Sequence, residues 1–91
     1  MPSRSDFGKL LAQHLKRRRL SARGFALQVK VGTSFLRFVM LGERPVPPKR
    51  IEVWADVLGL SGEERERFVE EAWLTHAPEY VRELVERLRK Q

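Results

Sequence analysis

Hydrophobic residues recur at intervals of three and four along most of this chain, a spacing that places them on one face of an α-helix. In the first such stretch, residues 6–18, the apolar positions include Phe7, Leu11 and Leu15. A strand-like alternation of β-branched residues is confined to residues 29–31, which is too short for a strand. The pattern therefore predicts an all-α fold.

Prolines and glycines divide this pattern into helical segments. A dense proline run at residues 45–48 excludes the interior of a helix and predicts an extended connection. The expected helices are residues 6–18, two short helices within 20–44, one from Pro48 to Gly59, one opening at Ser61 and one opening at Pro78. Trp54 and Trp73 are predicted to fill the core between the fourth and fifth helices.

Residues 20–44 predict two short helices joined by a tight turn, the arrangement of a helix-turn-helix unit. Ser21 is a suitable N-cap for the first helix, Gly32 can cap the second, and Gly42 is placed to end it. The inner faces would comprise Leu20, Phe25, Ala26 and Val29 in the first helix and Leu36, Val39 and Met40 in the second. In DNA-binding proteins the second helix of such a unit enters the major groove.

Charge is distributed unevenly between the two halves of the 91-residue chain. Residues 1–50 carry 12 Lys or Arg and two acids, whereas residues 51–91 carry six Lys or Arg and ten acids. A basic half that contains the helix-turn-helix favours a polyanionic partner, although a solvated, arginine-rich surface is the alternative. The start of the chain has no apolar signal region, and no stretch is long enough to span a membrane. We expect a cytoplasmic, nucleoid-associated protein.

The sequence predicts neither an enzyme nor a metalloprotein. It has no cysteine, no HExxH motif, no nucleophile elbow and no glycine-rich phosphate loop. His14 and His76 are its only histidines, and no acidic residue stands at metal-ligand spacing from either. We expect no cofactor, and the sequence indicates no small-molecule effector.

Four stretches carry a resemblance to the Cro and phage-repressor-like (XRE) helix-turn-helix family: FGKLL, LSARGFALQVKVGTS, LRFVMLGER and RIEVWADVLGLS, which lie within residues 7–61. The resemblance implies a compact, lambda-repressor-like bundle of five to six helices. It also implies a transcriptional regulator, a repressor or autoregulator, that binds an inverted repeat in duplex DNA as a homodimer. Residues 1–61 would form the DNA-binding core. Residues 62–91 would add C-terminal helices to the same domain, with a possible dimerisation element.

The chain departs from the family pattern at several positions. Many family members have Gln where this chain has Ala22, and they favour Gly where it has Lys30. Leu15 and Met40 stand where the family usually pairs an Arg with a Glu. Removing one partner of a buried ion pair is costly, whereas replacing both with apolar residues can be neutral. The joint change is therefore compatible with the fold.

By the same resemblance, the base-reading positions are Thr33, Ser34, Arg37 and Phe38. An arginine can chelate guanine O6 and N7, and a phenylalanine can pack on a thymine methyl group. Phe35 fits core packing and DNA contact equally well. The apolar outer face of this helix also leaves open an alternative, a protein-binding module that serves as an inhibitor or polymerase partner.

Two further sets of residues are predicted to support DNA binding. Phosphate contacts are expected from residues within and beside the helix-turn-helix: Arg18, Arg19, Arg23, Lys30, Arg44, Lys49 and Arg50. The sixth helix carries an apolar stripe of Val81, Leu84, Val85 and Leu88. That stripe fits a dimer seam and the closure of the monomer core equally well.

Overall fold

The computed structural model describes residues 7–90, without the side chains of Glu79 and Arg82. Within that range it contains helices and no strand, which confirms the predicted all-α fold. The helices are α1 (Phe7–Arg17), α2 (Ala22–Gln28), α3 (Thr33–Met40), α4 (Pro48–Val57), α5 (Gly62–Leu74) and α6 (Glu79–Arg89). Residue 6, the expected start of the first helix, lies outside the described residues.

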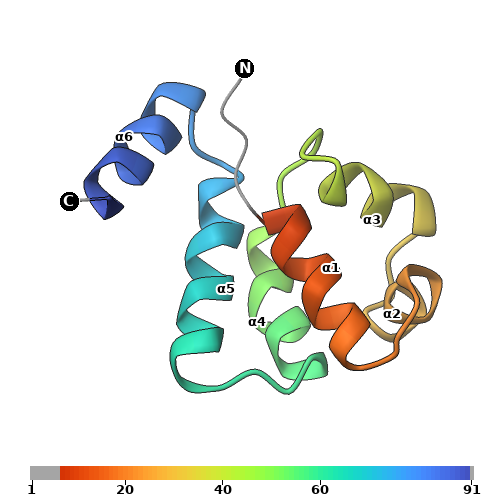
Figure 1. Cartoon of the computed structure of the whole chain (residues 1–91). Coiled ribbons are helices and arrows are strands. Elements are labelled where there is room, and N and C mark those ends of the chain that lie inside the picture. Colours follow the sequence, from red (N-terminus) through yellow and green to blue (C-terminus); the bar gives the residue numbers. More distant parts are fainter. Residues whose placement is uncertain (1–6, 91) are drawn as a thin grey trace.

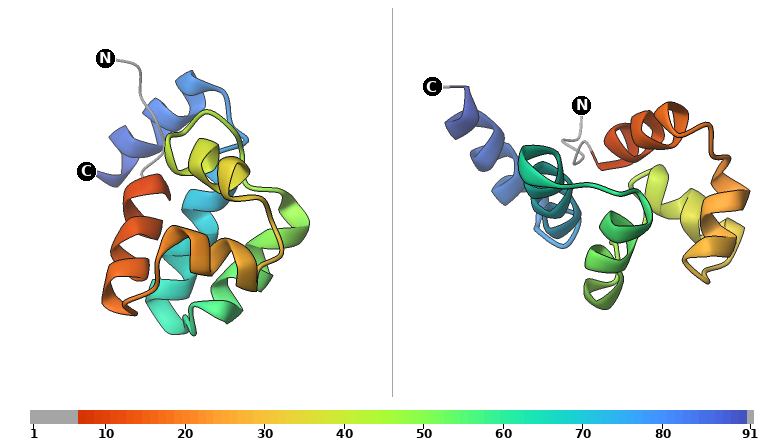
Figure 2. Two further views of the ribbon diagram at one scale, coloured as in Figure 1. Left: turned by 90° about the vertical axis from the view of Figure 1, so that its right-hand side faces the viewer. Right: turned by 90° about the horizontal axis from the view of Figure 1, so that it is seen from below.

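The first five helices form a compact group around one core (Figure 1). Helix α1 packs against both α3 and α5, α2 packs against α3, and α4 packs against α5. Helix α6 projects from the end of α5 on the side away from α2 and α3 (Figure 2). The helix-turn-helix and the C-terminal helix therefore lie at opposite sides of the molecule.

Aromatic residues from four helices make the centre of the core. Phe7, Phe25, Trp54 and Phe68 are each fully buried. The Trp54 ring meets Phe25 edge-on at a centroid distance of 5.5 Å, and the Phe7 and Phe68 centroids are 5.0 Å apart. Large aromatic side chains contribute much of the apolar area that a small domain can bury. Phe68 of α5 thus belongs to the same core as the helix-turn-helix.

Gly8 allows α1 and α3 to pack closely against each other. A Cβ atom on Gly8 would overlap the backbone carbonyl of Met40, at the end of α3. Leu15 is buried, and Met40 packs against the same core. Apolar residues therefore occupy both positions at which the family resemblance places an ion pair.

Four helices end in the same hydrogen-bonded motif. After α2, the Lys30 N–H bonds to the Leu27 carbonyl and the Val31 N–H bonds to the Ala26 carbonyl, as in a Schellman motif. Each motif requires one residue in the left-handed conformation, and these residues are Arg19, Lys30, Gly42 and Gly59. Gly42 ends α3 as predicted. Two of the four positions carry a long basic side chain instead of glycine.

The prediction for Trp73 was wrong. Trp54 is fully buried, but the Trp73 side chain is 52% exposed. Helix α5 turns Phe68 and Ala72 towards the core. Because successive residues of a helix are about 100° apart, Trp73 lies off that buried stripe. It borders an open groove of about 480 Å³ whose lining includes Val85 of α6.

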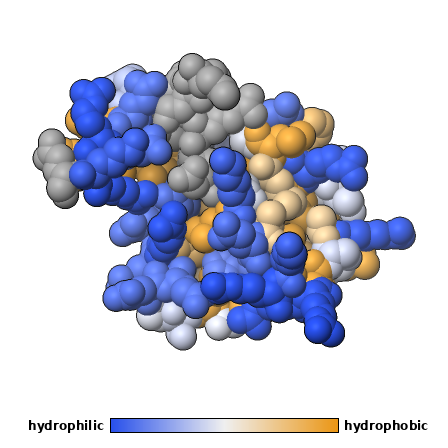
Figure 3. Space-filling view, in the orientation of Figure 1, coloured by the Kyte–Doolittle hydropathy of each residue, from blue (hydrophilic) through white to orange (hydrophobic). Residues whose placement is uncertain are grey.

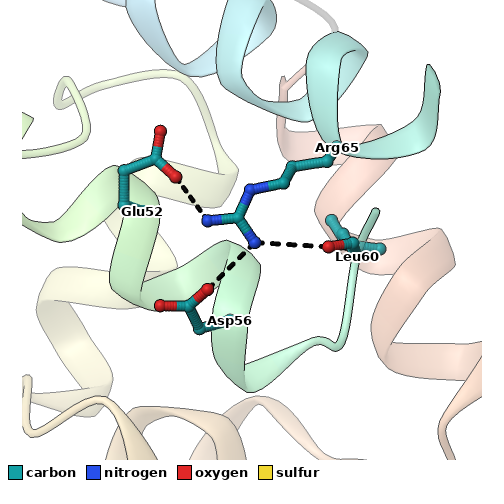
Figure 4. Close-up of polar contacts among 4 residues, drawn as sticks. All are labelled: Glu52, Asp56, Leu60 and Arg65. Atoms are coloured by element: carbon teal, nitrogen blue, oxygen red, sulfur yellow. Dashed lines mark hydrogen bonds and ion pairs between the residues drawn. The ribbon is translucent and has the colours of Figure 1, made fainter. Parts of the chain in front are cut away.

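Arg65 fastens α5 to α4 (Figure 4). Its guanidinium group is hydrogen-bonded to Glu52, lies 2.9 Å from an Asp56 carboxylate oxygen and donates to the Leu60 carbonyl at 3.2 Å. These bonds cross the turn between the two helices, so they fix the angle at which α5 leaves α4.

Candidate nucleic-acid interface

Local backbone preferences set the start of α2 and the turn between α2 and α3. Ser21 caps α2 as predicted, because its Oγ accepts a hydrogen bond of 2.9 Å from the Gly24 N–H. Lys30 turns the chain with a φ of 59°. Gly32 is the N-cap of α3 and has extended backbone angles. This geometry starts α3 directly after the turn.

The two helices face the core with the predicted residues. Phe25, Ala26 and Val29 of the first segment are buried, as are Leu36 and Val39 of α3. Because the inner stripe of α3 is fixed in this way, the opposite face must point to solvent.

All four predicted base-reading residues of α3 have exposed side chains: Thr33, Ser34, Arg37 and Phe38. Phe35 instead is partly buried and packs against the core. This favours core packing over DNA contact for Phe35. Exposed hydrophobic atoms gather over the end of α3 (Figure 3), where Phe38 is 41% and Leu41 is 51% exposed. The outer face of α3 therefore combines hydrogen-bonding and apolar groups.

Arg44 lies over one of these exposed apolar groups. Its guanidinium carbon is 5.6 Å from the centroid of the Phe38 ring. A cation held against an aromatic face gains about 0.5–1 kcal/mol at an exposed site. The contact fixes a positive charge beside the outer face of α3, and the sequence pattern gave no indication of it.

The predicted phosphate-binding residues differ in their surroundings. The side chains of Arg19, Arg23, Lys30, Arg44 and Lys49 are exposed. Arg18 lies close to Gly59, in the turn between α4 and α5. Arg50 is partly buried, and its Nη1 donates a hydrogen bond of 2.9 Å to the Val29 carbonyl at the end of α2. Arg50 therefore also braces the helix-turn-helix.

His14 occupies a buried position on the inner face of α1. Burial lowers the pKa of its imidazole below the ordinary value of 6.5, and the Glu64 carboxylate, 3.9 Å from Nδ1, offsets part of this effect. Among the described residues His14 Nε2 has no hydrogen-bond partner. His14 therefore lies in the protein core, away from the exposed face of α3.

Two features are not found in the described part of the chain. Among the described side chains, no group of three or more His, Asp or Glu residues could hold a metal ion. None of the described helices is long and apolar enough to cross a membrane.

Comparison with known proteins agrees with this geometry. A family model described as a helix-turn-helix domain matches residues 6–68. The match extends from α1 into α5 and includes the whole candidate interface. No match was found among curated proteins or among solved structures.

Proposed function

Because this chain belongs to the family of helix-turn-helix DNA-binding domains, we propose that it is a sequence-specific transcriptional regulator that binds duplex DNA. The observation that carries this proposal is the exposure of all four candidate base-reading side chains of α3. We place it among the Cro-like (XRE) regulators and infer a repressor or autoregulator associated with the nucleoid.

In this proposal α3 lies in the major groove. Arg37 is the main base reader and chelates a guanine, while Phe38 packs on a thymine methyl group. Thr33 and Ser34, in the first turn of α3, hydrogen-bond to base edges or to phosphates. Their hydroxyl groups lie near the helix N-terminus, which attracts anions.

The flanking cations clamp the DNA backbone. In the sequence, Lys30 precedes the reading helix α3 and Arg44 follows it. Phosphate contacts fix the register of the protein on the duplex without reading sequence. Arg18, Arg19, Arg23, Lys49 and Arg50 complete the proposed set.

We infer that the regulator acts as a homodimer through α6. In the apolar stripe of this helix, Leu84 is 50% and Leu88 is 58% exposed, whereas Val81 and Val85 are partly buried. A single reading helix contacts few bases, so two half-sites related by symmetry are the usual route to specificity. A self-complementary apolar stripe suits such a twofold contact.

A salt series tests DNA binding itself. If several cations neutralise phosphates, the logarithm of the binding constant should fall with a slope of about −0.9 per contact against the logarithm of salt concentration. We expect at least about four contacts per protomer. A flat dependence, or no binding to any duplex, would rule out the proposed function.

A pair of substitutions separates base reading from phosphate binding. Arg37→Ala should cost about 1–3 kcal/mol and relax the preference at one base pair. Lys49→Ala should weaken binding to all duplex sequences alike. It is a better control than Arg50→Ala, because Arg50 also braces α2. Equal weakening of specific and random duplexes by Arg37→Ala would show that α3 does not read bases.

The exposed Phe38 favours one second candidate, a protein-binding module that uses the apolar face of α3. The DNA proposal predicts that Phe38→Ala weakens only sites that carry the contacted thymine. Replacing this thymine with uracil, which lacks the methyl group, should then mimic the substitution. Loss of a protein complex with DNA binding intact would favour the protein-binding module.

A further inference from the structure

The connection between α3 and α4, residues 41–47, is buried at one point. Val46 has no exposed surface, although its neighbours Pro45 and Pro47 are not buried. Proline has no N–H, so Val46 carries the one backbone donor of residues 45–48. A buried backbone N–H or carbonyl group without a partner is costly. Val46 therefore needs partners from elsewhere in the chain.

Two consecutive side chains at the end of α5 supply them. The Val46 N–H donates to Thr75 Oγ1 at 3.0 Å, and the Thr75 hydroxyl donates in turn to the Ala72 carbonyl at 2.5 Å. His76 Nε2 is hydrogen-bonded to the Val46 carbonyl. A carbonyl oxygen can only accept, so Nε2 carries the proton in this contact. We call this set of bonds the Val46 clamp.

In the sequence, the Val46 clamp lies close to residues of the proposed DNA-reading face. Arg44, which covers Phe38, is two residues before Val46. The intervening Pro45 stiffens the segment, because its φ angle is fixed. On the other side, Thr75 and His76 lie in the turn that leads from α5 into α6. The Val46 clamp thus connects the segment that follows α3 to the end of α5.

We propose that Thr75 and His76 are positioning residues for DNA binding, an inference that rests on the proposed function. By holding Val46, they fix the path of the chain after α3 and so the position of Arg44 against Phe38. A segment that is ordered before binding loses less conformational entropy when the complex forms. Without the clamp, the end of α3 and its cation must be ordered by the DNA itself.

Matched substitutions test the proposal. Thr75→Val keeps the shape of the side chain and removes the hydroxyl group, whereas Thr75→Ser keeps the hydroxyl group. His76→Phe keeps a ring beside Trp73, whose centroid is 5.8 Å from that of His76, but removes the donor. The probe is a duplex of about two helical turns, selected by the wild-type protein from a random library.

Two readouts are measured at a temperature where circular dichroism shows every variant to be folded. For Thr75→Val and His76→Phe we expect DNA affinity to fall about tenfold, near the upper value of one hydrogen bond. The salt slope should be unchanged, because the phosphate contacts remain. Amide hydrogen exchange at Val46 should accelerate by a similar factor in Thr75→Val. Thr75→Ser should restore both affinity and protection.

Arg65→Gln provides the control for stability alone. It removes bonds between α4 and α5 that do not involve the α3–α4 connection. It should lower the unfolding temperature and leave the DNA affinity of the folded protein unchanged. Wild-type affinity in a folded Thr75→Val protein, with Val46 exchange accelerated, would overturn the positioning role alone. Absence of duplex binding by the wild-type protein would overturn the proposed function and this inference together.

Discussion

Lys30 occupies a backbone conformation that glycine adopts at lower cost. Its φ of 59° is left-handed, and the Cβ atom of an L-residue is crowded there. We predict that Lys30→Gly stabilises the protein by about 1 kcal/mol, measured by urea unfolding. The same variant should bind DNA more weakly and reduce the salt slope by about one contact. The wild-type lysine would then lower the stability of the protein and supply a positive charge at the proposed interface.

Lys30→Ala separates the two effects of this substitution. It removes the charge but keeps a Cβ atom in the left-handed conformation. We therefore expect the same loss of DNA affinity with no gain in stability. A Lys30→Gly protein that is no more stable than the wild type would show that the backbone strain at this position is negligible.

His14 should make stability depend on pH. Burial lowers its pKa in the folded protein, so below the ordinary value of 6.5 the unfolded chain binds a proton that the folded protein resists. Stability should be full above that value and be lost as pH falls towards the folded pKa. The slope cannot exceed one proton, about 1.4 kcal/mol per pH unit. His14→Leu should flatten this part of the profile, measured by urea unfolding at several pH values.

A matched variant tests the assignment to His14. Gln13→Leu changes the exposed neighbour of His14 and leaves both histidines in place, so its pH profile should keep the wild-type slope. A His14→Leu profile that runs parallel to that of the wild-type protein would contradict the assignment.

Sequence reasoning found the candidate base-reading residues but not the groups that support them. The outward direction of Arg37 and Phe38 follows from helical periodicity once Leu36 is placed inward. By contrast, the hydrogen bond from Arg50 to Val29 spans 21 residues of sequence, and the bond from Val46 to Thr75 spans 29. Such contacts depend on how separate helices pack, and no local spacing encodes them.

At the scale of the helices, Gly8 is a position where α1 tolerates little change. Because a Cβ atom there would overlap the Met40 carbonyl, we predict that Gly8→Ala destabilises the protein by about 1–3 kcal/mol, the usual cost of overpacking. Lys9→Ala, at an exposed position of the same helix, should change stability by less than about 0.5 kcal/mol. Thermal unfolding of both variants tests this. A Gly8→Ala protein as stable as the wild type would mean that α1 and α3 can separate freely.

The existence and order of the helices followed from the sequence, whereas the face of α5 that is buried did not. The proline run, Gly42 and Gly59 set helix limits locally, so these limits were predictable. Trp73 was misplaced because a large aromatic residue near an apolar stripe normally packs inward. Only the direction of α5, fixed by Phe68 and by the bonds of Arg65, turns Trp73 outward.

For the whole molecule, the location of charge and apolar surface is compatible with the proposed assembly of two copies on DNA. The basic half of the chain contains the helix-turn-helix, and the acidic half contains α5 and α6. Helix α6 projects on the side away from α2 and α3 (Figure 2). A dimer formed through α6 would therefore leave both reading helices free to reach DNA.

This arrangement predicts that Leu84→Glu combined with Leu88→Glu abolishes a homodimer that forms at micromolar concentration. Both leucines are at least half exposed, so the change should not unfold the monomer. Like charges introduced on both sides of a twofold contact repel each other across it. Light scattering should report a monomer for the double variant and a dimer for Val53→Glu, which alters an exposed apolar residue of α4. A double variant that stays dimeric would place the seam elsewhere, and one that unfolds would assign the stripe to the monomer core.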